Sequence, residues 1–221
     1  MLTTAGLLFW GLLVGLDLIS VPQVMISRPL VAGVGAGLLT GDPVAGFAVG
    51  VILELFALDV LPVGAVRYPD YGPATVVAVA AAAHTPIAGG VGISVALGLG
   101  IAYLGEWSIV ATRRLTSHHV QRAEAELDAG SRGALSRVHL GGIGRDAVRA
   151  LSVTGLGLLV AWGVRTWIPV QGRAAVLLTA AMTGAALATA TLGALRLRER
   201  RRAIGWFATG LGISLVWVAL R

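Results

Sequence analysis

The chain has 221 residues, of which 56% are hydrophobic and 13% charged, and its mean hydropathy is +0.83. This composition excludes an ordinary soluble domain, and several apolar runs approach the roughly 20 residues that a helix needs to cross a bilayer. The sequence predicts an all-α polytopic membrane protein, a single domain over residues 1–221, with about six to seven membrane segments. Cysteine is absent, which excludes disulfides, zinc–thiolate sites and cysteine nucleophiles within the chain.

The formal net charge of +6 comes from arginine, which gathers in two polar stretches, residues 112–146 and 196–202. Short basic segments between apolar spans mark the cytoplasmic side of a membrane protein. The distribution therefore argues against a nucleic-acid partner and places residues 112–146 in a cytoplasmic loop, as a surface helix followed by a glycine turn. His118 and His119 in this loop are adjacent, so they do not share a helix face, and neither a metal nor a cofactor is expected.

In chain order, apolar residues 2–19 come first. They lack a basic leading region and a clear cleavage site, so we expect a retained membrane segment rather than a signal peptide. Asp17 lies near the end of this segment. It fits equally well as a carboxylate at the membrane interface, where it costs little, and as part of a polar site.

The next apolar segment, residues 30–39, is too short to span a bilayer upright. Arg28 and Pro29 precede it, and the sequence Gly41-Asp42-Pro43 ends it. Short apolar segments interrupted by glycine and proline are typical of re-entrant or discontinuous membrane helices, which commonly line binding sites. An ordinary interfacial loop is the alternative.

Residues 44–61 are expected to form a span that contains Glu54. A carboxylate near the bilayer centre costs about 2.5–3.5 kcal/mol on insertion scales, so Glu54 is predicted to face a protein interior or a watery cavity. Asp59 would lie about 140° round a continuous helix from Glu54, and both could meet one cavity if the helix unwinds after Ala57. Small residues four apart favour close helix packing rather than a phosphate-binding loop; these are Gly33, Gly37, Gly41, Gly46 and Gly50.

Residues 75–110 are membrane-like apart from a break at 84–90, predicted as a tight turn or a second re-entrant hairpin. His84 in this break is interpreted as a hydrogen-bonded residue at a helix end, with solute binding or proton transfer as the alternative. Two further spans are expected at residues 147–166 and 174–195, and a last, short apolar segment at 205–220.

The residues SRPLVAG, GLLTGDPVAGFAVGVILELFAL, PVGAV and PD, in that order and spacing, resemble the sugar-channel subunit IIC of the mannose/fructose/sorbose family of phosphoenolpyruvate-dependent phosphotransferase systems. The stretch RAEAELDAGSRGALSRVHL resembles the part of that family that ends in a histidine, here His139. The resemblance implies a second membrane subunit, IID, and an oligomer. It also implies that the phosphohistidine proteins IIA and IIB phosphorylate the entering sugar, so that catalysis resides on other chains.

The resemblance also implies the site residues. Glu54 matches the glutamate of the family's Leu-Glu motif, a sugar ligand, and a carboxylate can accept strong hydrogen bonds from sugar hydroxyls. Gly64 and Ala65 match a Gly-Ala pair where small residues let the backbone approach the sugar, and Asp70 matches the acidic residue that follows. Before Arg28 the segment SVPQVMI departs from the acidic and aromatic residues of some mannose-type members, which leaves Gln23 as a polar ligand. Residues expected to support the site are Asp17, Arg28, Asp42, Asp59 and Arg67.

These features predict a permease subunit for a hexose or amino sugar in the inner membrane of a bacterium. The chain also looks short at its C-terminus beside the family, which leaves open a non-transporting scaffold or regulatory subunit on the same fold. A third hypothesis is an ion-coupled small-solute transporter in which Asp17, Glu54 and Asp59 relay protons. Arg67 has two interpretations, an ion pair with Asp70 or Asp59 and a direct contact with substrate.

Overall fold

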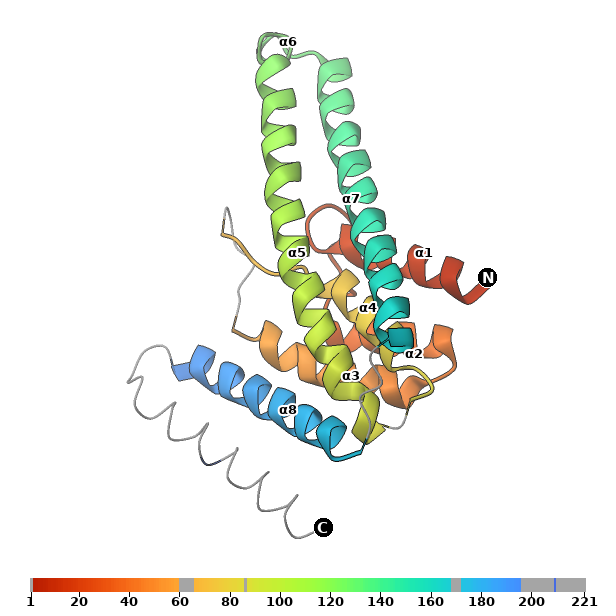
Figure 1. The fold of residues 1–221 in the computed structure, drawn as a ribbon. Helices are drawn as coiled ribbons and strands as arrows, with labels where there is room; N and C mark the ends of the chain where they lie inside the picture. The colour runs from red at the N-terminus through yellow and green to blue at the C-terminus, as the bar shows by residue number, and fades with distance from the viewer. Residues whose placement is uncertain (1, 60–65, 86, 168–171, 196–208, 210–221) are drawn as a thin grey trace.

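The computed structural model describes residues 2–59, 66–85, 87–167, 172–195 and 209 (Figure 1). Throughout these residues the regular elements are helices, which confirms the all-α prediction. The helices are α1 (Leu2–Asp17), α2 (Pro29–Thr40), α3 (Pro43–Ala57), α4 (Tyr71–Ala82), α5 (Ile87–Arg122), α6 (Glu124–Asp128), α7 (Arg132–Trp167) and α8 (Gly172–Leu195). The apolar segment expected at 205–220 and the basic stretch 196–202 lie outside the described residues, apart from Thr209.

The helices fall into two length classes. Three of the described helices are long and apolar enough to cross a membrane, over Gly90–Arg122, Arg132–Trp167 and Gly172–Thr191. The helices α1 to α4 have 12 to 16 residues, and at 1.5 Å per residue they are shorter than a roughly 30 Å hydrocarbon core. The span expected at residues 44–61 is one of these: α3 stops at Ala57.

Helices α2 and α3 form a tight antiparallel hairpin because each helix has glycines on the side that contacts the other helix. A Cβ on Gly46 would lie 2.5 Å from the carbonyl oxygen of Gly33 and 2.7 Å from the Cα of Gly37. A Cβ on Gly50 would lie 2.9 Å from the carbonyl oxygen of Pro29. These glycines therefore have the predicted packing role. Gly41 differs from them, because its φ of +77° ends α2 in the left-handed conformation that glycine adopts without strain.

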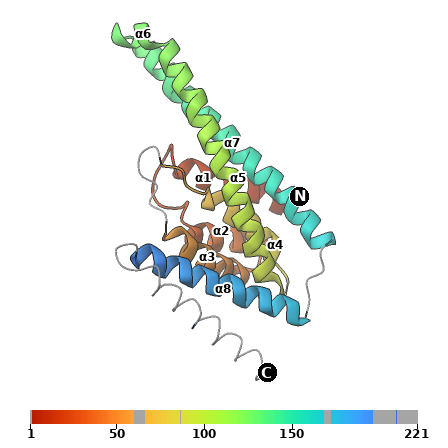
Figure 2. The same cartoon turned by 60° about the vertical axis from the view of Figure 1, so that its left-hand side comes forward.

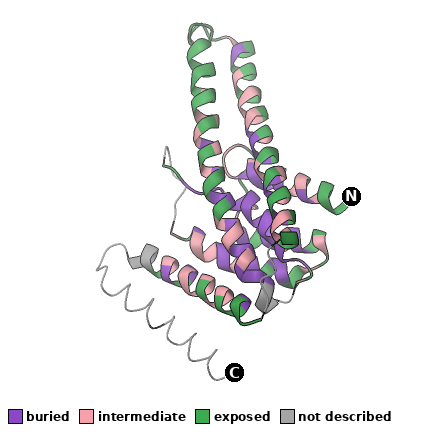
Figure 3. Ribbon diagram, in the orientation of Figure 1, coloured by how far each residue is buried: buried purple, intermediate pink, exposed green. Residues whose placement is uncertain are grey.

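Helix α4 lies at the centre of the bundle and is buried along almost its whole length (Figure 3). Its sequence, YGPATVVAVAAA, is mostly alanine and valine, and these small side chains allow close approach from several directions. Helices α1, α2, α3, α5 and α7 all pack against it. The short helices α1 to α4 thus form a body with the lower parts of α5 and α7, and α8 lies along α3 and α5 at its edge (Figures 1 and 2).

The polar stretch 112–146 is mainly helical, and its helices are continuous with those of the apolar body. Helix α5 continues to Arg122, α6 follows, and α7 begins at Arg132, so the two long helices project from the body as a hairpin (Figures 1 and 2). The expected glycine turn is Gly130, with φ of +74°. The end of this hairpin is largely exposed (Figure 3), as expected for a polar surface.

Candidate functional site

Glu54 lies near the C-terminal end of α3 and reaches the beginning of α2. Its Oε1 forms an ion pair with Nη2 of Arg28, and its Oε2 accepts a hydrogen bond of 3.1 Å from the backbone N–H of Leu30. Arg28 is the residue before α2, and Pro29 is the first residue of the helix. Free N–H groups and the positive end of the helix dipole stabilise a carboxylate at this position.

This arrangement neutralises a carboxylate inside an apolar hairpin without closing it off. The side chain of Glu54 retains 19% of its accessible surface and that of Arg28 retains 37%. A carboxylate has about four lone-pair positions, and the contacts to Arg28 and Leu30 occupy two of them. Glu54 can therefore accept further hydrogen bonds from hydroxyl groups of a ligand.

The chain leaves the helix soon after Glu54. The N–H of Leu58 still bonds to the carbonyl of Glu54 at 3.0 Å, but α3 ends at Ala57 and Asp59 lies in the turn that follows. The helix thus ends after Ala57, which is the condition under which Asp59 can share a cavity with Glu54. Gly64 and Ala65, the predicted small residues of the site, lie outside the described residues.

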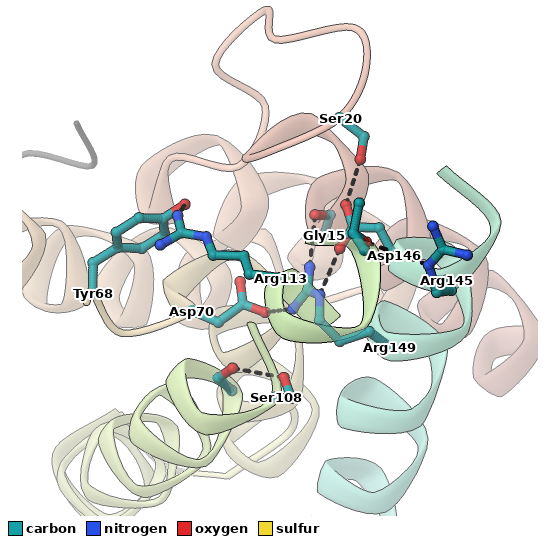
Figure 4. Close-up of polar contacts among 11 residues, drawn as sticks. Gly15, Ser20, Tyr68, Asp70, Ser108, Arg113, Arg145, Asp146 and Arg149 are labelled. Atoms are coloured by element: carbon teal, nitrogen blue, oxygen red, sulfur yellow. Dashed lines mark hydrogen bonds and ion pairs between the residues drawn. The ribbon is translucent and has the colours of Figure 1, made fainter. Parts of the chain in front are cut away.

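Asp70 belongs to a buried ion-pair network between α7, α1 and the residues before α4 (Figure 4). Arg149 on α7 pairs with Oδ2 of Asp70 through Nη1 and with Oδ1 of Asp146 through Nε, the latter at 2.6 Å. Its Nη2 donates to the carbonyl of Gly15 at 3.0 Å, and Ser20 donates to Asp146 at 2.7 Å. Asp70 thus pairs with Arg149, so the ion pair considered between Arg67 and Asp70 is wrong.

The network is one positive charge short. It contains two carboxylates and one guanidinium, and all three side chains are at most 4% exposed. Oδ1 of Asp70 is buried and has no hydrogen-bond partner among the described residues. Gly105 leaves room for Asp70, because a Cβ at that position would lie 2.5 Å from the Cβ of Asp70. The sugar contact expected for Asp70 stays a prediction, and the contacts of this residue in the structure are those of a buried helix connection.

Asp17 is buried inside the protein and hydrogen-bonded to the backbone. It is 2% exposed, and its carboxylate accepts backbone N–H bonds from Val24 at 2.6 Å and from Ser27 at 2.9 Å. These bonds fix the connection between α1 and α2. Gln23 lies in the same connection, is exposed, and donates to the carbonyl of Ile19 at 3.1 Å.

Asp42 and His84 connect the turn between α2 and α3 to the residues that follow α4. Asp42 caps α3 through the N–H of Ala45, and it also accepts the backbone N–H of His84 at 2.9 Å. These two backbone donors lower the pKa of Asp42 below its usual value. Nε2 of His84 lies 2.8 Å from the carbonyl oxygen of Thr40. His84 is thus a hydrogen-bonded residue beyond a helix end, as predicted.

Sequence reasoning missed the two buried charged residues of α7. Asp146 is the last residue of the polar stretch 112–146 and Arg149 lies at the beginning of the expected span 147–166, and both are buried, at 3% and 5% exposure. A signal existed: they share a face of α7 with buried positions three and four residues apart, namely Ala150, Thr154, Gly157 and Ala161. The apolar stripe of α7 therefore begins with two charged residues.

The fold and the site together define a class, the polytopic helical membrane proteins that hold polar residues between short, interrupted helices. Within this class, the family model of the PTS (phosphotransferase system) sorbose-specific IIC component matches residues 1–189. The chain belongs to this family.

Individual relatives agree with the family match. The chain is 29% identical over 129 residues to the PTS system mannose-specific EIIC component of Escherichia coli K12, covering 58% of this chain and 47% of the relative. It is 32% identical over 127 residues to the fructose permease IIC component of Bacillus subtilis (58% and 46%). It is 29% identical over 124 residues to the PTS system sorbose-specific EIIC component of Klebsiella pneumoniae (55% and 45%). The matches thus span about half the length of these bacterial relatives.

Two solved structures share the fold. One, described as a membrane protein, has a TM-score of 0.70 at 20% identity and covers 97% of this chain and 87% of its own. The other is a cryo-EM structure of the mannose transporter ManYZ in complex with microcin E492, with a TM-score of 0.64 at 19% identity over 98% and 95% of the two chains.

Proposed function

We propose that this chain is the membrane subunit through which a hexose or amino sugar passes, to be phosphorylated by partner proteins as it enters a bacterial cell. The observation that carries the proposal is Glu54. In a chain that belongs to the sorbose-type IIC family, the structure places this carboxylate in the α2–α3 hairpin, neutralised by Arg28 and still partly exposed.

The proposed role of Glu54 is to accept hydrogen bonds from sugar hydroxyls. Arg28 and the N–H of Leu30 hold the carboxylate in position, so little side-chain freedom is lost when a sugar binds. Gly64, Ala65 and Asp59 follow α3 and are the proposed neighbours of the sugar, and Asp70, Gln23 and Arg67 stay candidates. Phosphorylation needs no catalytic residue of this chain.

The proposed partners are a IID membrane subunit and the soluble IIA and IIB phospho-carriers, in an oligomer in the inner membrane. Support for a second membrane subunit comes from the solved mannose transporter ManYZ, which shares the fold. The bacterial origin of the curated relatives supports the location.

The test is phosphoenolpyruvate-dependent phosphorylation of a panel of radiolabelled hexoses and amino sugars. It uses membranes that contain this chain and a IID partner, supplemented with the soluble phospho-carriers. Glu54→Gln keeps the volume but loses the charge, and a hydrogen bond to a charged group contributes about 1.5–3 kcal/mol, so the variant should bind the sugar about 10- to 150-fold more weakly.

The matched control is Glu124→Gln, the same change at the exposed beginning of α6. It should phosphorylate like the parent. If Glu54→Gln inserts normally and also phosphorylates like the parent, the proposed role of Glu54 is wrong. If the parent phosphorylates no sugar of the panel while both membrane subunits are assembled, the scaffold or regulatory subunit is favoured. Uptake that collapses with the proton gradient and ignores phosphoenolpyruvate would favour the ion-coupled transporter.

A further inference from the structure

A groove of about 280 Å³ lies at the base of the α5–α7 hairpin, apart from Glu54 and from the buried network. Seven residues line it: Arg67, Val110, Arg113, Arg114, Ser117, His118 and Gln121. Ligand pockets commonly measure about 300–1,000 Å³, so the groove suits a small ligand or one group of a larger ligand. Among the residues that the structure describes, its lining contains three arginines and no carboxylate.

One wall of the groove is a single face of α5. The six lining residues from Val110 to Gln121 are spaced by three and four positions, which places their side chains side by side along the helix. Polar groups of this face other than the arginines are the hydroxyl of Ser117, the imidazole of His118 and the amide of Gln121. The imidazole and the amide can donate hydrogen bonds to an anion, whereas the hydroxyl of Ser117 already donates to the carbonyl oxygen of Arg113 at 3.0 Å.

The other wall is Arg67, and Arg113 holds it in place. Arg113 donates to the carbonyl of Val66 at 3.1 Å and to the hydroxyl of Tyr68 at 2.9 Å, and its guanidinium lies 5.1 Å from the centre of the Tyr68 ring. Figure 4 shows Arg113 beside Tyr68. These contacts fix the segment that carries Arg67 against α5. The groove is therefore built from two parts of the chain that specific bonds keep together.

The positive charge of the groove is uncompensated within the described residues, where none of its three arginines pairs with a carboxylate. Like charges that converge on one cavity repel each other, and an anion in the groove would remove this repulsion. The planar guanidinium of arginine matches the geometry of phosphate and can bind two of its oxygens at once. Arginines from two directions suit a tetrahedral anion better than a flat carboxylate.

We propose that this groove binds a phosphate monoester. Exposed Trp107 lies on α5 just before Val110, and tryptophan is enriched at the membrane–water interface. The groove thus lies where α5 leaves the apolar body for the polar hairpin. At this level the phosphate can come from a sugar phosphate in solution or from a lipid headgroup, since interfacial arginines also attract anionic lipids. Glu54 does not line the groove, so the proposal does not depend on the role of Glu54, although Arg67 is also a candidate residue of the sugar site.

The first measurement is calorimetric titration of the purified full chain, in phosphatidylcholine nanodiscs, with inorganic phosphate and with hexose 6-phosphates at constant ionic strength. We expect saturable binding. The double variant Arg67→Gln/Arg114→Gln removes two charged donors and should bind at least about tenfold more weakly. Both residues are exposed, so thermal melting of the variant should match the parent; if it does not, Arg114→Gln alone carries the test.

The matched control is Arg132→Gln/Arg137→Gln, two exposed arginines at the beginning of α7 outside the groove. It changes the net charge equally and should leave binding unchanged. Glu54→Gln should also bind phosphate like the parent, so a failure of the groove and a failure of the sugar site are separable. If the control loses as much phosphate binding as the groove variant, the loss is caused by the change in net charge, and the proposal is overturned.

Vesicle flotation separates the two sources of phosphate. For this assay the protein is solubilised in detergent instead of held in nanodiscs. It is mixed with phosphatidylcholine vesicles that contain or lack phosphatidic acid, whose headgroup is a phosphate monoester. Groove-dependent recruitment by phosphatidic acid, without saturable binding of free phosphates, would identify a lipid headgroup as the ligand. Groove-dependent titration by hexose 6-phosphates would identify a soluble phosphate ester. The absence of any groove-dependent binding to phosphate, hexose 6-phosphate or phosphatidic acid would overturn the proposal.

Discussion

Arg149 is the single cation of the buried network, and its replacement is the sharpest test of that network. Arg149→Met keeps a long side chain but removes the charge and every donor. Asp70 and Asp146 would then be buried together without a cation, at 0% and 4% side-chain exposure. Removing one partner of a buried ion pair costs about 3–5 kcal/mol, and the second orphaned carboxylate places the expected loss of unfolding free energy toward the upper end of this range.

Asp70→Asn is the matched change at the other end of the same bond, and we expect it to be mild. The native network holds two carboxylates and one guanidinium, whereas the variant holds one of each. The amide oxygen can still accept from Arg149, and the amide nitrogen takes the place of Oδ1, which already has no partner among the described residues. The expected loss is at most about 1 kcal/mol, the typical net value of one hydrogen bond.

The assay is equilibrium unfolding in mixed micelles, with helix content followed by circular dichroism as sodium dodecyl sulfate replaces a mild detergent. We expect Arg149→Met to lose at least about 2 kcal/mol more than Asp70→Asn. The double variant should be more stable than Arg149→Met alone, because it buries one carboxylate instead of two. Equal losses in the two single variants would refute the view that Arg149 compensates an excess of negative charge.

Two further changes test the packing of the short helices. Gly46→Ala places a methyl group 2.5 Å from the carbonyl oxygen of Gly33 and should destabilise the protein by about 1–3 kcal/mol in the same assay, as overpacking does. The control is Gly100→Ala, where nothing lies within 4 Å of the added methyl group, and it should be neutral or stabilising. Equal effects of the two changes would contradict the close α2–α3 contact. Asp17→Ala removes the acceptor of two backbone N–H groups and should cost about 1–3 kcal/mol, with faster proteolysis between α1 and α2; a connection as resistant as in the parent would contradict its anchoring role.

The α2–α3 hairpin could be predicted from sequence because its determinants are local. Proline begins each helix, glycine and aspartate form the turn, and glycines at intervals of four mark the packed faces. The prediction that Glu54 faces a protein interior rested on the cost of a charge in lipid. What local sequence could not provide was the partner: Arg28 lies at the far end of the preceding helix, and only the antiparallel packing of the hairpin brings it to Glu54.

The buried network could not be predicted in the same way. Arg149 has the same chemistry as the solvated arginines near it in the sequence, and its burial is decided by α1 and the segment before α4, which lie more than 70 residues away along the chain. For residues 112–146 the sequence predicts a surface helix and a glycine turn, but not that the two long helices α5 and α7 continue through this stretch. Polarity alone does not distinguish a loop from helices that continue out of the apolar body.

Arginine has two different roles in this structure, and the roles differ in whether a carboxylate balances its charge. Inside the body, Arg149 faces an excess of carboxylates, and Arg28 faces one carboxylate at a helix beginning. These arginines make buried carboxylates tolerable in an apolar environment. At the base of the hairpin, Arg67, Arg113 and Arg114 converge on a groove with no carboxylate among its described lining residues. Water alone can solvate exposed arginines, and solvation does not explain why Arg113 contacts Val66 and Tyr68, the two neighbours of Arg67, and so holds this segment against α5. Positioned cations without a protein counter-charge are what an anion site requires, and this contrast is the reason to look for the ligand there.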